Sequence, residues 1–239
     1  MAKITLKDFD WYISARAIAG NMLHDAAAAL GYGLASYRAP TRVEEMRTVR
    51  ELKRRRHTLM TLLDAMQLFS LVRATAKLGG CMAEVGVYQG GSARLIREAD
   101  ASRSLHLFDT FEGLPELAAI DTPARSGRFR KGLWSCPLES VRNYFGDCDR
   151  VHFHKGLFPV TGEGVKDERF SFVHADVNLY SSTWEVLKFF YPRLLRGGIL
   201  VSHDFTLFPG VREAMEEFFK DLPEPVIELS GNQAMVVKV

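Results

Sequence analysis

The chain has 239 residues, of which 47% are hydrophobic and 25% charged. This is enough apolar material for one large α/β domain, and the length is too short for two. Lysine and arginine number 31 against 29 for aspartate and glutamate, so the overall charge does not favour nucleic acid or a membrane surface as a partner. The chain has no apolar run of roughly 18 residues and no signal-peptide pattern, and its three cysteines lack metal-ligand spacing. These features predict a cytoplasmic protein.

The first part of the chain, residues 1–80, is predicted to be a helical segment. An alanine-rich stretch at 14–30 is followed by chain-breaking glycines and Pro40. Thr41 has Glu44 three residues later, which is the capping-box spacing, so one helix is expected to run on from there. Its later apolar stripe would consist of Leu59, Leu62, Leu63, Met66 and Phe69. We expect this segment to serve as a lid or a dimerisation element for a main domain at 81–239.

From Cys81 onward, short apolar strands alternate with helices. Strands are expected at 81–86, 104–109, 150–154, 170–176 and 197–203, and helices at 91–100, 138–146, 182–195 and 210–220. The tail predicts a hairpin, with strands at 226–229 and 234–239 around Ser230-Gly231-Asn232. This order predicts a mostly parallel sheet with a late antiparallel strand. The irregular stretch at 112–137 is long enough to be a functional loop.

The most specific motif is the segment EVGVYQGGSA at 84–93, which follows an apolar strand and opens a helix. Its glycines permit a sharp turn and a close approach of backbone to ligand, and the helix N-terminus offers unpaired N–H groups. The spacing between Gly86 and Gly90 does not match the dinucleotide pattern G-x-G-x-x-G. An acid two residues before the first glycine instead suits a methionine-type cofactor, whose cationic amino group Glu84 could face.

A second carboxylate, Asp109, ends the next strand, 25 residues after Glu84. That is about the spacing at which such folds place a ribose-binding acid. The competing interpretation is an ordinary strand–helix turn in which Asp109 caps a helix. Two later strands also end in polar residues. Asp176 ends the fourth strand, and His203 and Asp204 end the fifth. Because ligands bind beyond the carboxyl ends of parallel strands, these three side chains are expected to converge.

Several stretches resemble the macrocin O-methyltransferase family (TylF/MycF type). They are EVGVYQGGSA, FDTFEGLPE, the segment from Trp134 to Phe145, HKGLFP, HADVNLYSST, YPRLLRGGILVSHDF and PGVREAMEEFF, and they cover about 81–221. The resemblance implies a Rossmann-like class I methyltransferase fold with a seven-stranded, mostly parallel sheet. It also implies an S-adenosyl-L-methionine-dependent O-methyltransferase acting on a hydroxyl of a small molecule, such as a sugar or another natural-product moiety.

The resemblance also implies the site residues. Cofactor contacts are expected from Glu84, Gly86, Val87, Tyr88, Gly90, Ser92, Asp109, Phe111, Gly156 and Asp176. Asp176 and His203 are the expected catalytic residues. In the family, acids at the ends of the fourth and fifth strands hold a divalent metal, usually magnesium, which here assigns Asp176, His203 and Asp204 as ligands. His203 and Asn178 stand where the family commonly has acids.

Because of this departure, the sequence leaves two alternatives for the metal site. Magnesium prefers an all-oxygen shell, whereas imidazole suits manganese and other transition metals better. Either a metal such as Mg²⁺ or Mn²⁺ is retained, or His203 acts alone as the base. His203 and Asp176 could also be structural caps. Two further alternatives are a non-catalytic cofactor-binding module and, against the glycine spacing, a nicotinamide-dependent oxidoreductase.

One testable prediction concerns assembly. The first 70 residues carry more apolar surface than a lone pair of helices can hide, so we expect them to pack on the main domain and on a second copy, forming a homodimer. Light scattering at micromolar concentration should give twice the monomer mass of 26.9 kDa. A mass equal to that of the monomer would contradict this expectation.

Overall fold

The structure, a computed structural model, describes residues 22–23, 26, 40–55, 58–122, 124 and 129–239. The chain divides into two compact units, residues 1–40 and 41–239. In the first unit residues 22–23 and 26 are helical, and the rest of the predicted 14–30 helix lies outside the described residues. The boundary predicted at residue 80, and the lid or dimerisation role, stay predictions.

The second unit is built on a seven-stranded sheet in the order β3-β2-β1-β4-β5-β7-β6. The first five strands pair in parallel, whereas β7 runs antiparallel to both β5 and β6. The predicted fold class is thereby confirmed. The strands are β1 (Cys81–Val85), β2 (Leu105–Asp109), β3 (Val151–Lys155), β4 (Phe170–Ala175), β5 (Leu194–Ser202), β6 (Ile227–Glu228) and β7 (Ala234–Val237).

Burial explains the strand sequences. All six residues of β4 are buried, and four of the five in β1, as expected for central parallel strands covered on both faces. β3 lies at the edge of the sheet and exposes His152 and Lys155. A charged residue on an edge strand discourages pairing with another chain. The hydrophobic positions of these strands therefore specify their place in the sheet.

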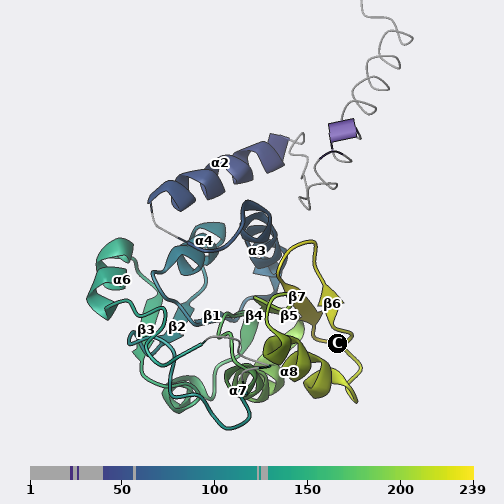
Figure 1. Ribbon diagram of the computed structural model, residues 1–239. Helices are drawn as coiled ribbons and strands as arrows, with labels where there is room; N and C mark the ends of the chain where they lie inside the picture. Colours follow the sequence, from purple (N-terminus) through teal and green to yellow (C-terminus); the bar gives the residue numbers. More distant parts are fainter. Residues whose placement is uncertain (1–21, 24–25, 27–39, 56–57, 123, 125–128) are drawn as a thin grey trace, which may run out of the picture. The chain divides into compact units, whose positions relative to one another are not determined.

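Helices cover both faces of the sheet (Figure 1): α3 and α4 on one side, α7 and α8 on the other. The core between the sheet and the second pair contains Phe170 of β4, Phe190 of α7 and Met215 of α8, all fully buried. The described helices of this unit are α2 (Pro40–Arg55), α3 (Leu62–Ala74), α4 (Gly91–Ala99), α6 (Leu138–Phe145), α7 (Tyr180–Phe190) and α8 (Pro209–Phe219). None of the described helices is long and apolar enough to cross a bilayer.

The prediction of one continuous helix from Thr41 is wrong, because the chain forms two helices there. α2 begins at Pro40 and ends at Arg55, and α3 starts afresh at Leu62. Leu59, predicted to lie in the apolar stripe, is in the connection with 64% of its surface exposed. The cause is a second N-cap, Thr61, whose hydroxyl oxygen accepts the backbone N–H of Asp64 at 3.1 Å.

The predicted start of α7, at residue 182, is also wrong, by two residues. The helix begins at Tyr180, and the Thr183 hydroxyl donates back to the carbonyl of Leu179 at 2.7 Å. Asp121, in the long loop, caps the first turn of the helix instead. Its carboxylate accepts hydrogen bonds from the backbone N–H and the hydroxyl of Ser181 at 3.1 and 2.5 Å. The loop thus anchors itself to the helix that follows β4.

The predicted tail hairpin is confirmed, and it is tied to α3 through a buried carboxylate. Asp64 accepts the backbone N–H of Asn232, in the hairpin turn, at 3.0 Å. A Cβ on Gly231 would lie 1.9 Å from the same carboxylate oxygen, so glycine is required there. This contact joins residues 168 positions apart in the sequence and holds the hairpin against the first turn of α3.

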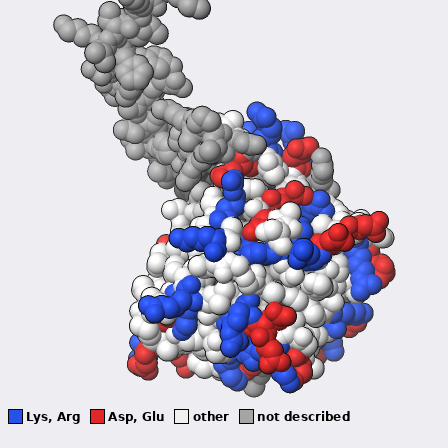
Figure 2. All heavy atoms as spheres, turned by 180° about the vertical axis from the view of Figure 1, so that it is seen from behind, with Lys and Arg blue, Asp and Glu red and all other residues white. Residues whose placement is uncertain are grey.

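Charges of both signs are interspersed on the molecular surface. Figure 2 shows, on the described part of the rear face, basic and acidic side chains intermixed rather than gathered in one basic patch. This agrees with the small net charge of the sequence.

A histidine pair between β2 and β3 predicts acid sensitivity. His106 Nδ1 lies 3.0 Å from His154 Nε2, and the ring of His106 stacks on the exposed His152. Burial, reinforced by these two histidines, lowers the pKa of His106 to about 4. Since the unfolded state, with a pKa near 6.5, binds the proton more readily, the stabilisation is complete above about pH 6.5 and lost as the pH falls toward 4.

We expect the free energy of unfolding to fall by about 1–3 kcal/mol over that window because of His106. Urea denaturation at several pH values should show a shallower decline for His106→Phe than for the parent chain. Lys220→Gln, which changes an exposed residue at the end of α8, is the control. Equal slopes for His106→Phe and the parent chain would contradict the assignment.

Candidate functional site

The loop between β1 and α4 requires glycine at both of its ends. Gly86 has a φ of +86°, and a Cβ on it would lie 1.9 Å from the carbonyl oxygen of Asp176. Gly90 has a φ of +83° at the start of α4, and a Cβ there would lie 2.9 Å from Val141 Cγ1. The positive φ and the short Cβ distance both disfavour any residue other than glycine at these two positions. The loop therefore passes directly against the main chain that follows β4.

Asp109 holds this loop in place from the end of β2. One carboxylate oxygen accepts the backbone N–H groups of Val87 and Tyr88 at 2.6 and 2.9 Å, and the other accepts that of Phe111 at 2.7 Å. A carboxylate that accepts several N–H bonds fixes the loop conformation strongly. The sequence analysis missed this positioning role. The predicted contact between Asp109 and the cofactor ribose stays a prediction.

Glu84 is fully buried beneath the loop and faces a histidine of the neighbouring strand. Its Oε1 lies 2.8 Å from Nδ1 of His174, on β4. Burial raises the pKa of Glu84 well above its ordinary value, although the Ser92 hydroxyl opposes the rise. Burial also lowers the pKa of His174 to about 4. The sequence analysis did not single out His174, because it reads as one position of an apolar strand and its partner is 90 residues away.

Asp176, His203 and Asp204 do converge, as predicted. The ladder of the sheet extends to these residues, because Asp176 N–H donates to Val85 and His203 N–H to Ala175. His203 Nδ1 lies 3.6 Å from an oxygen of Asp176, and His203 Nε2 lies 3.8 Å from an oxygen of Asp204. The other oxygen of Asp204 accepts the side-chain amide of Asn178 at 2.6 Å. The imidazole thus stands between the two carboxylates.

The surroundings of this cluster are strongly acidic. Burial favours the neutral form of His203, but the carboxylates around it, Asp176 first among them, outweigh burial and raise its pKa. Burial and repulsion from Asp176 raise the pKa of Asp204 to about 6. Such an environment stabilises a positive charge, carried either by the imidazole or by a bound cation. The donor set therefore fits a metal ion, although one with tolerance for nitrogen.

A cavity of about 280 Å³ opens beyond the carboxyl ends of the strands and includes this cluster. Of the predicted cofactor residues, Gly86, Val87, Tyr88, Ser92, Asp109, Gly156 and Asp176 line it. Glu84, Gly90 and Phe111 are not among its lining residues, and their contacts with the cofactor stay predictions. All three predicted metal ligands, Asp176, His203 and Asp204, line the same cavity. The structure therefore brings the two predicted sites into one space.

Another part of the cavity lining is an apolar and aromatic wall. It is formed by three segments, and its members include Leu59, Met60, Leu114, Pro115, Leu133, Trp134, Leu207 and Phe208. Phe129 joins two of these segments, since its ring meets Trp134 at 5.1 Å and Phe208 at 4.7 Å, both edge to face. The stretch at 112–137, predicted to be a functional loop, thus contributes residues to the lining of the cavity.

The sheet order and the glycine loop at its carboxyl edge define a Rossmann-like methyltransferase. The family model described as Macrocin-O-methyltransferase (TylF) matches residues 54–235, and the chain belongs to this family. The resemblance predicted from the sequence is confirmed. The chain is accordingly an S-adenosylmethionine-dependent O-methyltransferase, and the oxidoreductase and non-catalytic alternatives are set aside.

Individual relatives agree with this assignment. The 8-demethyl-8-(2,3-dimethoxy-alpha-L-rhamnosyl)-tetracenomycin-C 4'-O-methyltransferase of Streptomyces olivaceus is 30% identical, over 73% of each chain. The demethyldecarbamoylnovobiocin O-methyltransferase of Streptomyces niveus is 26% identical, over 91% of this chain and 88% of that protein. The solved structure of the O-methyltransferase NovP, 22% identical, shares the fold with a TM-score of 0.66 over 77% of this chain and 82% of that one.

The loop geometry predicts the effect of removing the Asp109 carboxylate. Asp109→Ala frees two N–H groups of the glycine loop, and the loss of charged hydrogen bonds should weaken S-adenosylhomocysteine binding by about 1–3 kcal/mol. Titration calorimetry measures this directly. Glu112→Ala, which removes an exposed acid three residues along, is the matched control and should bind normally. Unchanged affinity in Asp109→Ala would remove the positioning role.

Proposed function

We propose that the chain methylates a hydroxyl on a sugar carried by a natural product. One observation carries this proposal: a single cavity contains the glycine loop, the Asp176–His203 pair and an aromatic wall. Two relatives support the acceptor class by their names, one a methyltransferase of a rhamnosyl tetracenomycin, the other a mycinamicin III 3''-O-methyltransferase of Micromonospora griseorubida, which is 28% identical. Both names place the methylated oxygen on a larger, glycosylated molecule.

The cofactor occupies the side of the cavity formed by the glycine loop. Gly86 and Tyr88 supply close backbone approach there, and Asp109 holds the loop from below. Because Gly86 packs on the main chain of Asp176, a methyl group presented by a cofactor on this loop comes close to the Asp176 carboxylate. The methyl donor and the acidic cluster are thereby neighbours.

The acceptor occupies the side formed by the aromatic wall. Trp134 and Phe208 offer flat apolar faces on which the C–H groups of a sugar ring or an apolar aglycone can pack. The wall is assembled from the segment before α3, the long loop and the segment after β5. A small number of polar groups at the end of an apolar pocket is the usual way of fixing a ligand's orientation.

The reaction is an in-line displacement. The acceptor oxygen attacks the sulfonium methyl carbon, the carbon–sulfur bond breaks with its electron pair going to sulfur, and S-adenosylhomocysteine leaves. Holding oxygen and methyl about 3 Å apart supplies several kcal/mol of the barrier. The hydroxyl proton passes to the carboxylate of Asp176, which faces the cavity and remains 27% exposed.

A sugar hydroxyl is a weak acid, so its ionisation needs help. A divalent cation held by Asp176 and His203, two of the three ligands predicted from the sequence, would supply the Lewis acidity that makes the hydroxyl ionise more easily. Asp176 offers a carboxylate for it, and His203 offers a buried imidazole nitrogen that has no hydrogen-bond partner among the described residues. We further propose the cytoplasm as the compartment, which the three free cysteines support.

The proposal is tested with labelled S-adenosylmethionine and two sets of acceptors, glycosylated natural products and catechols. Label should pass to the sugar of glycosylated acceptors. Asp176→Asn should lower kcat by about a hundredfold or more, since it removes the proton acceptor, and should leave S-adenosylhomocysteine binding within a few fold. Asp167→Asn, an exposed acid on the same chain, is the control. Transfer to catechols alone, or full activity of Asp176→Asn, would contradict the proposal.

A further inference from the structure

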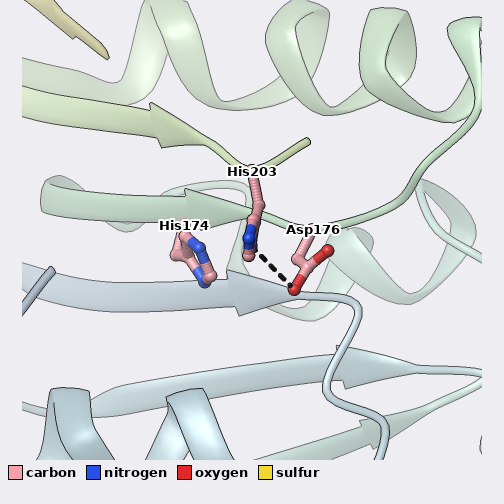
Figure 3. Close-up of side chains that lie close together, drawn as sticks. All are labelled: His174, Asp176 and His203. Carbon is pink, nitrogen blue, oxygen red and sulfur yellow. Dashed lines mark ion pairs between the residues drawn. The ribbon is translucent and has the colours of Figure 1, made fainter. Parts of the chain in front are cut away.

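Three side chains at the ends of β4 and β5 form a potential metal centre, and the sequence analysis predicted two of them, Asp176 and His203, as ligands. His174, Asp176 and His203 each place one donor atom within 4.8 Å of the donors of the other two (Figure 3). His174 lies on β4, His203 directly follows the adjacent parallel strand β5, and Asp176 follows His174 by two residues. Figure 3 shows the three side chains pointing toward one another. The set contains two imidazoles and one carboxylate.

One nitrogen of each histidine lacks a partner. His174 Nε2 and His203 Nδ1 are both buried, and neither makes a hydrogen bond with the described residues. A buried polar atom left unsatisfied costs about 1–3 kcal/mol, so such atoms call for an explanation. His203 Nδ1 is 3.6 Å from Asp176, too far for a hydrogen bond but suitable for two ligands that are each about 2 Å from a shared ion.

The remaining nitrogen of each histidine faces a carboxylate. Glu84 Oε1 lies 2.8 Å from His174 Nδ1. In the tautomer with the proton on Nδ1, Glu84 accepts this hydrogen bond and the lone pair is on Nε2. Asp204 lies 3.8 Å from His203 Nε2, on the side of the ring away from Asp176. Metal-binding histidines characteristically donate their second ring N–H to a carboxylate, which orients the ring and strengthens the ligand. Glu84 and Asp204 stand in this supporting position.

We propose that His174, Asp176 and His203 bind a first-row transition ion, such as Mn²⁺, Fe²⁺, Co²⁺ or Zn²⁺, in preference to Mg²⁺. Two imidazoles and one carboxylate suit these ions and leave positions open, whereas Mg²⁺ selects oxygen ligands. His174 takes the place that the sequence analysis gave to Asp204, and Glu84 becomes a positioning residue for His174. The inference rests on the proposed function only for what the ion does; its binding is independent of the acceptor.

The test measures metal binding to the full chain, stripped with a chelator and dialysed, without acceptor. Calorimetry should show one equivalent of Mn²⁺ or Co²⁺ binding at least tenfold more tightly than Mg²⁺. X-ray absorption of the zinc-loaded chain should count two imidazole ligands, a measurement that needs no variant. Tighter binding of Mg²⁺ than of Mn²⁺, or a count of one imidazole or none, would overturn the proposal.

Variants then separate the roles. His174→Gln should weaken Mn²⁺ binding at least tenfold, with S-adenosylhomocysteine binding showing that the fold persists. His203→Asp should shift the preference toward Mg²⁺. His152→Gln, an exposed histidine on β3, is the matched control and should bind Mn²⁺ like the parent chain. Unchanged Mn²⁺ binding by a folded His174→Gln would exclude His174 as a ligand.

Glu84→Gln distinguishes the two roles assigned to that residue. If Glu84 positions His174, Mn²⁺ affinity falls by about 10- to 100-fold while S-adenosylhomocysteine affinity is kept, and Glu84→Asp restores part of the loss. If Glu84 instead contacts the cofactor, the affinity for S-adenosylhomocysteine falls while the affinity for Mn²⁺ is kept. That outcome would remove Glu84 from the metal centre. A chain that binds Mn²⁺ as expected but methylates no sugar would contradict the proposed function alone.

Discussion

The site depends on the close contact between the loop after β1 and the main chain after β4. Gly86 touches the carbonyl of Asp176, and the N–H of Asp176 donates to Val85 at 2.9 Å, so cofactor loop and acidic cluster are joined by backbone rather than by side chains. Asp109 completes this arrangement by holding the loop from β2. Because β1, β2, β4 and β5 are parallel neighbours with mostly buried residues, their carboxyl ends cannot move independently. The cofactor loop and the carboxylate of Asp176, the proton acceptor proposed above, are therefore held in a fixed relation before any ligand arrives, which is the condition for effective proximity catalysis.

The buried pair of Glu84 and His174 is difficult to explain as a purely structural feature. Fully buried ionisable groups are costly unless they are paired and their remaining polar atoms are satisfied, and His174 Nε2 is not satisfied by any described residue. An apolar pair of similar volume would serve the sheet at least as well. His174, Asp176 and His203 each offer one ligand atom within 4.8 Å of the ligand atoms of the other two. A ligand shared by both histidines accounts for the two unsatisfied atoms together, which a role in folding does not.

Much of the fold was predictable because each strand is a short apolar run with clear breaks, and the observed β1 to β4 begin and end within one or two residues of their expected limits. The errors have local causes. Thr61 with Asp64 restarts a helix that the apolar stripe alone joined, and Thr183 binds its own helix while Asp121, sixty residues earlier, caps the first turn. The convergence of Asp176, His203 and Asp204 followed from parallel topology. His174 could not be found in that way, because only the register of β1 against β4 places Glu84 beside it.

The arrangement separates the chemistry from the choice of acceptor. The groups that act on the reacting atoms come from the ends of central strands, whose positions are set by the core and by the β1–β4 contact. The wall proposed to face the acceptor comes from connections: the residues before α3, the loop that ends at Trp134, and Leu207 with Phe208 after β5. Connections tolerate substitution and changes of length far better than central strands do. Acceptor specificity can therefore change through these three segments while the cofactor loop and the acidic cluster remain, which is how one fold can serve methyltransferases with different acceptors.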